Sequence, residues 1–151
     1  MSVQYQIIDP LEDPVWDSWI HTRIGSTIFH TSAWARVIHD SYGYSLHYFI
    51  FENDTSIFAV PMMELNSLFS GKRGVSLPFS DYCDPLGDRK VPVHSVVKSI
   101  TEYANTVGWR DIEFQCRGIT IELFSWNCIY RNSRAKKRCF RAEIGRISKP
   151  C

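Results

Sequence analysis

The stretch 92–108 is the segment that most constrains the fold of this chain. Its apolar residues recur at helical spacing, Pro92 stands where a first helical turn begins, and Gly108 stands where a helix ends. The segment 111–115 follows at once and alternates like a strand. Together with the two helices and three strands expected before it, this helix and strand indicate helices packed on a sheet, so a mixed α/β (α+β) fold is expected.

Two more helices are expected near the start of the chain. An Asp-Pro pair at positions 13–14 has the pattern of a cap and first turn, and a second helix over residues 31–42 is capped by Thr31 or Ser32 and stops at Gly43. The apolar stripe of the first helix is Val15, Trp16, Trp19 and Ile20. That of the second is Trp34, Val37, Ile38 and Tyr42.

Three strands are expected between the second and third helices. Segments 46–51 and 56–65 are rich in aromatic and aliphatic residues, and the polar residues 52–55 between them predict a hairpin. A third strand is expected over residues 73–77. We expect the three strands to form one antiparallel sheet, with the helix over residues 92–107 packed on it.

Two segments carry more than core residues. In the first, residues 29–38, Trp34 is expected to be buried against the sheet. In the second, residues 76–86, a short apolar run ends at Pro78, and a stretch without periodicity follows that contains two prolines, two aspartates, an aromatic residue and a thiol. A loop of this composition presents groups rather than filling space.

These segments resemble the FemAB-like transferases, a branch of the GNAT acyltransferase superfamily. The matching residues lie between Ile28 and Gln115 and are Phe29, His30, Trp34, Ser41-Tyr42-Gly43-Tyr44, His47-Tyr48, Pro61-Met62-Met63, Gly71-Lys72-Arg73-Gly74 and residues 76–86. The resemblance implies the N-terminal half of a FemAB-like protein, with a GNAT-like, mainly antiparallel mixed sheet flanked by helices. It also implies transfer of an acyl or aminoacyl group to a small-molecule, glycan or peptide amine in cell-envelope, peptidoglycan or polysaccharide metabolism, with acyl-coenzyme A or aminoacyl-tRNA as donor.

The chain departs from the family pattern at two places. The cell-wall members carry a lysine four residues after the tryptophan of the first motif, and Ile38 stands there in this chain. This favours the looser acyltransferase branch over enzymes that act on peptidoglycan precursors. The glycine-rich phosphate loop of GNAT enzymes is matched only over residues 115–118, so no donor site and no tightly bound cofactor are expected from the sequence.

The charge distribution divides the chain at Gln115. Residues 1–115 contain 8 basic and 14 acidic side chains, whereas residues 116–151 contain 9 and 2, together with four of the five cysteines. We therefore expect a GNAT-like domain over residues 1–115 and a basic tail over residues 116–151, which reads as a degenerate or out-of-frame end of a longer chain. Its basic cluster is Arg131, Arg134, Lys136, Lys137, Arg138 and Arg141. This cluster is either solvated or bound to nucleic-acid phosphates.

Cysteine spacing and hydropathy set the expected compartment. The five cysteines form no close pair, which favours reduced thiols, and Cys83 is expected to be an inert buried thiol. No stretch reaches the roughly 20 apolar residues of a membrane helix, and the first residues do not have the pattern of a signal peptide. A cytoplasmic protein is expected. The histidines lack ligand spacing, so no metal is expected.

The loop 76–86 contains the candidate chemistry. Asp81 is predicted as the catalytic proton acceptor for an amine nucleophile, which must lose a proton when it attacks an acyl carbonyl. The predicted substrate-binding residues are His30, Ser80, Tyr82 and Asp84. For both aspartates the competing interpretation is a turn cap, and for His30 it is a cap of the following helix.

Three further expectations concern an alternative function, the activity of the chain alone and self-association. The alternative to a transferase is a non-catalytic binding module whose basic tail recruits nucleic acid or another partner. The chain alone is expected to be inactive, because donor-binding elements would follow the strand 111–115. That strand would expose an apolar edge that favours self-association unless residues 119–130 cover it.

Overall fold

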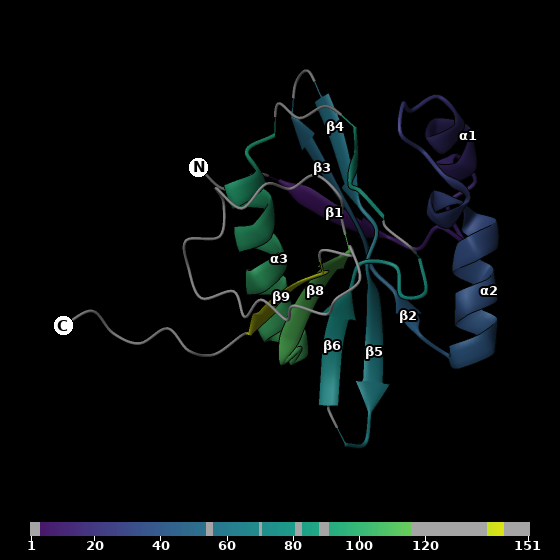
Figure 1. Cartoon of the computed structure of the whole chain (residues 1–151). Helices are drawn as coiled ribbons and strands as arrows, with labels where there is room; N and C mark the ends of the chain where they lie inside the picture. Colours follow the sequence, from purple (N-terminus) through teal and green to yellow (C-terminus); the bar gives the residue numbers. More distant parts are fainter. Residues whose placement is uncertain are drawn as a thin grey trace.

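The computed structural model describes residues 4–53, 56–69, 71–80, 83–87, 91–115 and 139–143 (Figure 1). The elements before the loop of residues 76–85 are β1 (Tyr5–Ile8), α1 (Trp16–His21), the 3-10 turn η1 (Ile28–His30), α2 (Ser32–Tyr42), β2 (Ser45–Leu46), β3 (Tyr48–Asn53), β4 (Ser56–Val60), β5 (Met63–Ser67) and β6 (Gly71–Val75). The elements after it are β7 (Leu86–Gly87), α3 (Val93–Val107), β8 (Asp111–Gln115) and β9 (Cys139–Glu143). The expected α+β class with mainly antiparallel strands is confirmed for this part of the chain.

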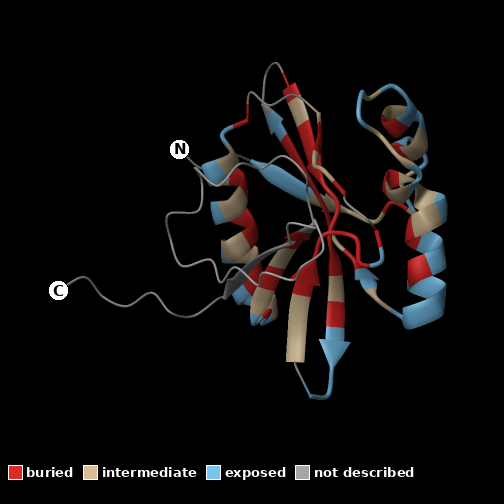
Figure 2. Ribbon diagram, viewed as in Figure 1, coloured by how far each residue is buried: buried red, intermediate tan, exposed pale blue. Residues whose placement is uncertain are grey.

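Helices cover both faces of the strands. Figure 1 shows α1 and α2 on one side and α3 on the other. In β3, Tyr48 and Ile50 belong to the core under α1 and α2, whereas Phe49 and Phe51 belong to the core under α3. This alternation explains why the strand is apolar from Tyr48 to Phe51, since both of its faces are buried there (Figure 2).

The strands form two sheets rather than the expected one. Within the described residues, the orders are β1-β3-β4-β7 and β2-β5-β6-β8-β9. The expected strand 56–65 is broken between β4 and β5 at Pro61 and Met62, and the strand 46–51 is broken at His47. The two breaks face each other, because the main-chain N–H of His47 donates to the carbonyl of Met62 at 2.9 Å. A bent hairpin therefore passes from one sheet to the other, and Pro61 suits the bend because it lacks a ladder N–H.

The third helix and the strand after it are confirmed. Pro92 precedes α3, and Gly108 ends it in the left-handed conformation at φ 78°. β8 then pairs in parallel with β6, and every other strand pair in the described part is antiparallel. The unit β6-α3-β8 encloses the loop that carries the candidate site.

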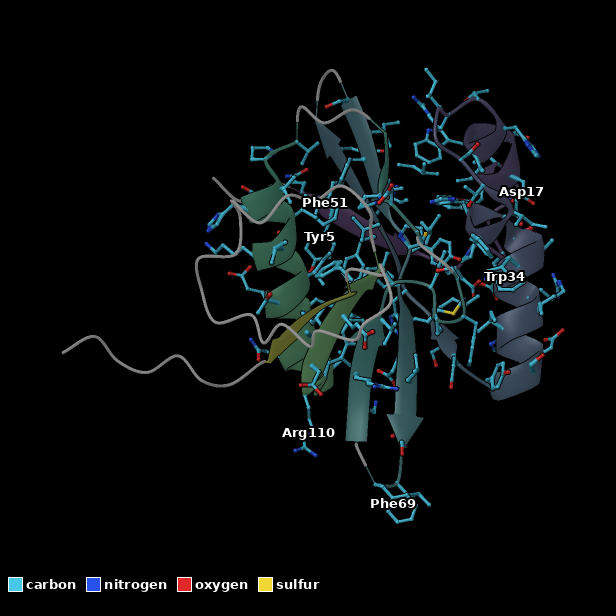
Figure 3. All side chains as sticks on the ribbon, viewed as in Figure 1. Tyr5, Asp17, Trp34, Phe51, Phe69 and Arg110 are labelled. Carbon is cyan, nitrogen blue, oxygen red and sulfur yellow. The ribbon has the colours of Figure 1, made fainter. Side chains whose placement is uncertain are left out.

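The buried faces of the first two helices differ from the predicted stripes. Trp16 and Ile20 of α1 are buried as predicted, whereas Val15 is 63% exposed. In α2, Thr31 caps the first turn by accepting the N–H of Trp34 at 3.3 Å. Its buried residues are Ala35 and Ile38; Val37 and Tyr42 are more than half exposed, and Trp34 is half-buried (Figure 3). The small side chain of Ala35 lets the helix approach the strands through a face that an apolar-stripe pattern does not identify.

Part of the basic segment joins the second sheet. β9 pairs antiparallel with β8, from Asp111 opposite Glu143 to Gln115 opposite Cys139. The outer edge of β8 is thus covered by residues 139–143, and the expected cover by residues 119–130 lies outside the described residues. Among the described residues, no helix has the length and apolar character needed to span a membrane.

Candidate functional site

The loop between β6 and β7 begins with a strained turn. The main-chain N–H of Ser76 donates to the carbonyl of Glu113 at 2.8 Å, which extends the pairing with β8. Leu77 and Phe79 then take positive φ angles of 42° and 66°. The hydroxyl of Ser80 donates to the carbonyl of Leu77 at 2.7 Å and closes the turn. Ser80 is only 7% exposed, so its placement is that of a turn-closing residue.

His30 ties this loop to η1. The main-chain N–H of Thr27 donates to Nδ1 of His30 at 3.1 Å, so Nδ1 is an acceptor. Nε2 therefore carries the proton and donates to the main-chain carbonyl of Asp84 at 2.9 Å. Burial lowers the pKa of His30, which favours this neutral form. The histidine caps η1 rather than α2. It is only 1% exposed, so it binds the loop carbonyl as a buried residue.

The same geometry bears on Cys83. Its Sγ lies 3.2 Å from Nε2 of His30 and is 2% exposed. Because Nε2 carries a proton in the neutral ring, it cannot accept the thiol proton. The pair is therefore not arranged as a nucleophile with its base, in line with the expectation of an inert thiol.

Of the two predicted site carboxylates, the structure describes Asp84 but not Asp81. Asp84 is partly exposed and contributes its main-chain carbonyl to the contact with His30. The predicted catalytic Asp81 and the predicted substrate-binding Tyr82 lie outside the described residues, so their roles stay predictions. What the structure adds is that the segments on both sides of them are fixed.

Beneath the loop, Tyr48 carries a buried hydroxyl. The residue is fully buried, and its ring meets Trp16 edge to face at 5.2 Å. Its hydroxyl has no hydrogen-bond partner among the described residues. Burial raises the pKa of Tyr48 well above its usual value. The sequence predicted a core aromatic here and contained no signal for an unpaired hydroxyl.

A second polar cluster lies on the α3 side. Glu64 accepts a hydrogen bond from Nε1 of Trp109 at 2.7 Å and forms an ion pair with Nζ of Lys72 at 3.1 Å. The hydroxyl of Tyr103 contacts Nδ1 of His47 at 3.0 Å, and the His47 ring meets the Trp109 ring edge to face. Burial lowers the pKa of His47. The pKa of Glu64 is lowered despite the opposing effect of burial, because Trp109 and Lys72 favour its ionised form.

This cluster joins β5 and β6 to the end of α3, and its members mostly satisfy each other. Among the described residues, no three His, Cys, Asp or Glu side chains are placed to hold a metal ion. We therefore regard the loop between β6 and β7 as the candidate functional site and the second cluster as a structural link.

A group of aromatic residues next to the loop, two of them exposed, is not apparent from the sequence. The ring of Tyr42 stacks on Phe79 at 4.6 Å and on Tyr44 at 5.4 Å. Tyr42 was assigned to the buried stripe of the second helix because it lies at helical spacing. The Gly43 that ends α2 turns the chain so that Tyr44 returns beside Tyr42.

Comparison with known proteins leaves the residues themselves as the basis for any assignment. No protein-family model matches this chain, and no curated protein is significantly similar to it.

Proposed function

We propose that this chain provides the acceptor side of a FemAB-like, GNAT-type acyl or aminoacyl transferase, with the loop between β6 and β7 next to the amine acceptor. The observation that carries the proposal is the anchoring of this loop. Ser80 and His30 hold the loop through the carbonyls of Leu77 and Asp84, while Asp81 and Tyr82 fall between the two anchors. The order of elements from α1 to β8 supports it further, since the FemAB-like resemblance implies the same order.

A loop held at both ends suits the positioning of an acceptor. Transfer requires the amine to be placed in line with an acyl carbonyl, and a fixed site supplies that orientation before the reaction begins. A loop anchored by main-chain carbonyls keeps its side chains available for substrate.

The proposed reaction is direct transfer. The amine nitrogen attacks the acyl carbonyl, a C–N bond forms, the thioester or ester bond of the donor breaks, and the donor thiol or hydroxyl leaves. Asp81 takes the proton that the amine loses and passes it to the departing sulfur or oxygen, so that the donor leaves as a neutral thiol or hydroxyl. The His30 and Cys83 geometry fits a mechanism without a covalent enzyme intermediate, because Nε2 of His30, 3.2 Å from the Cys83 thiol, already carries a proton and cannot take another from the neutral thiol.

We further propose that the chain does not complete the reaction alone and depends on donor-binding elements outside residues 1–115. The test combines binding and turnover. The purified chain is titrated with amine acceptors at pH 8 and assayed with acyl-coenzyme A and with aminoacyl-tRNA. We expect acceptor binding that Asp81→Asn weakens and that Glu52→Gln, an exposed carboxylate on β3, leaves unchanged.

The outcomes separate the proposals. Acceptor binding that Asp81→Asn does not alter would return Asp81 to a turn-capping role. Donor-dependent acylation by the chain itself would contradict the dependence on further elements. Salt-sensitive nucleic-acid binding that is lost when Arg134, Lys136 and Lys137 are changed to Gln, without any acceptor binding, would favour the binding-module alternative.

A further inference from the structure

A stack of three aromatic rings, Tyr42 and Phe79 exposed and Tyr44 partly buried, lies beside the candidate loop. Phe79 and Tyr44 both lie nearly parallel to Tyr42, with interplanar angles of 20° and 21°. Tyr42 is 53% exposed and Phe79 is 56% exposed. Because one side of Phe79 rests on Tyr42, the exposed part of Phe79 is mainly the opposite face and the edge of its ring.

The backbone at Phe79 makes this exposure notable. A non-glycine residue at positive φ carries backbone strain that the surrounding structure must offset. For Leu77, complete burial in the core offsets the strain. Phe79 has no such compensation, since more than half of it faces solvent and its ring contact is with the equally exposed Tyr42. Glycine or asparagine would fit this backbone better, so packing and backbone geometry do not account for a phenylalanine.

We infer that Tyr42, Tyr44 and Phe79 form a platform on which the pyranose ring of an amino sugar stacks. The inference rests on the proposed function, because it names the class of amine acceptor. The faces of a pyranose ring present C–H groups, and these are attracted to the negatively polarised face of an aromatic ring. A flat, exposed ring held by a strained loop provides such a face.

The charges around the platform select among ring-shaped ligands. Tyr42 is the last residue of α2, so the platform lies at the carbonyl end of a helix, where partial negative charge accumulates. The exposed Asp40 lies in the same turn, and Nδ1 of His39 is held by the carbonyl of Tyr44 at 2.9 Å. This environment disfavours the phosphate of a nucleotide. It favours ammonium groups and hydroxyl donors, which an amino sugar carries.

The test is a binding titration that needs no acyl donor. A glucosamine tetramer is added to the isotopically labelled chain, and amide NMR shifts are followed. We expect saturable shifts confined to residues 42–44 and 77–80, and weaker binding of the N-acetylated tetramer. Phe79→Asn should weaken binding by about tenfold, as expected for the loss of one stacking ring, without lowering the unfolding midpoint, because asparagine accepts the left-handed backbone.

Two further variants complete the design. Phe79→Leu keeps an apolar side chain without a ring face, and it should weaken binding to a similar extent even if the asparagine variant folds poorly. Phe69→Ala removes a ring that is 99% exposed at the β5-β6 turn, away from the platform, and should bind like the parent (Figure 3).

Each contrary result overturns the inference. These are the absence of saturable shifts in the parent, undiminished binding by both Phe79 variants, preference for the N-acetylated tetramer, or shifts at the platform with uridine monophosphate only. Failure of acyl transfer leaves the inference standing, because the titration measures binding alone.

Discussion

The contact between Gly74 and Trp109 gives the sharpest prediction about stability. A Cβ at Gly74 would lie 2.1 Å from Cζ3 and 2.2 Å from Cε3 of Trp109, whereas carbon atoms normally meet at about 3.5–4.0 Å. Trp109 is 2% exposed and donates to Glu64 at 2.7 Å, so its ring has little room to move. Gly74→Ala must therefore displace the indole or bend β6.

The expected cost has two sources, the clash of the new Cβ with the indole and the weakened hydrogen bond between Trp109 and Glu64. Overpacking a core costs about 1–3 kcal/mol, and loss of a hydrogen bond to a charged group costs about 1.5–3 kcal/mol. Both losses come from one movement of the Trp109 ring and overlap in part. We expect Gly74→Ala to lower the free energy of unfolding by about 3 kcal/mol, measured by urea denaturation with far-ultraviolet circular dichroism.

A double-mutant cycle identifies the cause. Trp109→Leu removes the atoms that clash, so Gly74→Ala should cost about 1 kcal/mol or less in that background. The control is Gly25→Ala, at a glycine with φ 88° and open space around it, whose cost should be equal in both backgrounds. If Gly74→Ala cost the same with and without the indole, the clash would not be its cause and the reasoning would fail.

Three smaller predictions concern pH, a helix cap and a half-buried tryptophan. Burial lowers the folded-state pKa of both His30 and His47 below the ordinary value of 6.5, so the unfolded state binds more protons as the pH falls; stability should be full above about pH 6.5 and decline below it, and a urea midpoint that rises from pH 7 to pH 5 would contradict this. Thr31→Ala should cost about 1 kcal/mol through loss of the cap, whereas Thr31→Asn should stay close to the parent. Trp34→Ala should cost about 2 kcal/mol, below the range for a fully buried aromatic, because the residue is only partly buried; a cost above about 4 kcal/mol would show that its packing is tighter than its exposure indicates.

Local signals predicted the elements whose limits depend on neighbouring residues. Pro92 and Gly108 bound α3 because a fixed φ suits a first turn and a left-handed residue ends a helix. β8 was predicted from a different local signal, the alternation of buried and less buried side chains along a strand with one buried face. The break at Pro61 and Met62 was not predicted, because both halves of the 56–65 segment are apolar and the change of sheet depends on a contact with His47.

The sequence predicted where the candidate site lies along the chain, but not the hydrogen bonds that hold its loop in place. The loop composition indicated that groups are presented there. The contact between His30 and Asp84 joins residues 54 positions apart, and the tautomer of the ring depends on an amide of Thr27, so neither follows from spacing along the chain. The aromatic platform was missed because Tyr42 fits a helical stripe equally well whether that face is buried or exposed.

The two anchors of the loop act on main-chain atoms, and this has a consequence for how the site can vary. The hydroxyl of Ser80 and the ring of His30 bind the carbonyls of Leu77 and Asp84, so these two bonds place the loop without specifying the side chain at position 84. Core packing fixes Leu77, whereas the strained Phe79 rests on an exposed ring. The fold therefore separates the groups that hold the loop from the groups that the loop presents. Under the proposed function, acceptor preference would therefore be set by a few exposed side chains, while the buried supports, and with them the stability, stay the same.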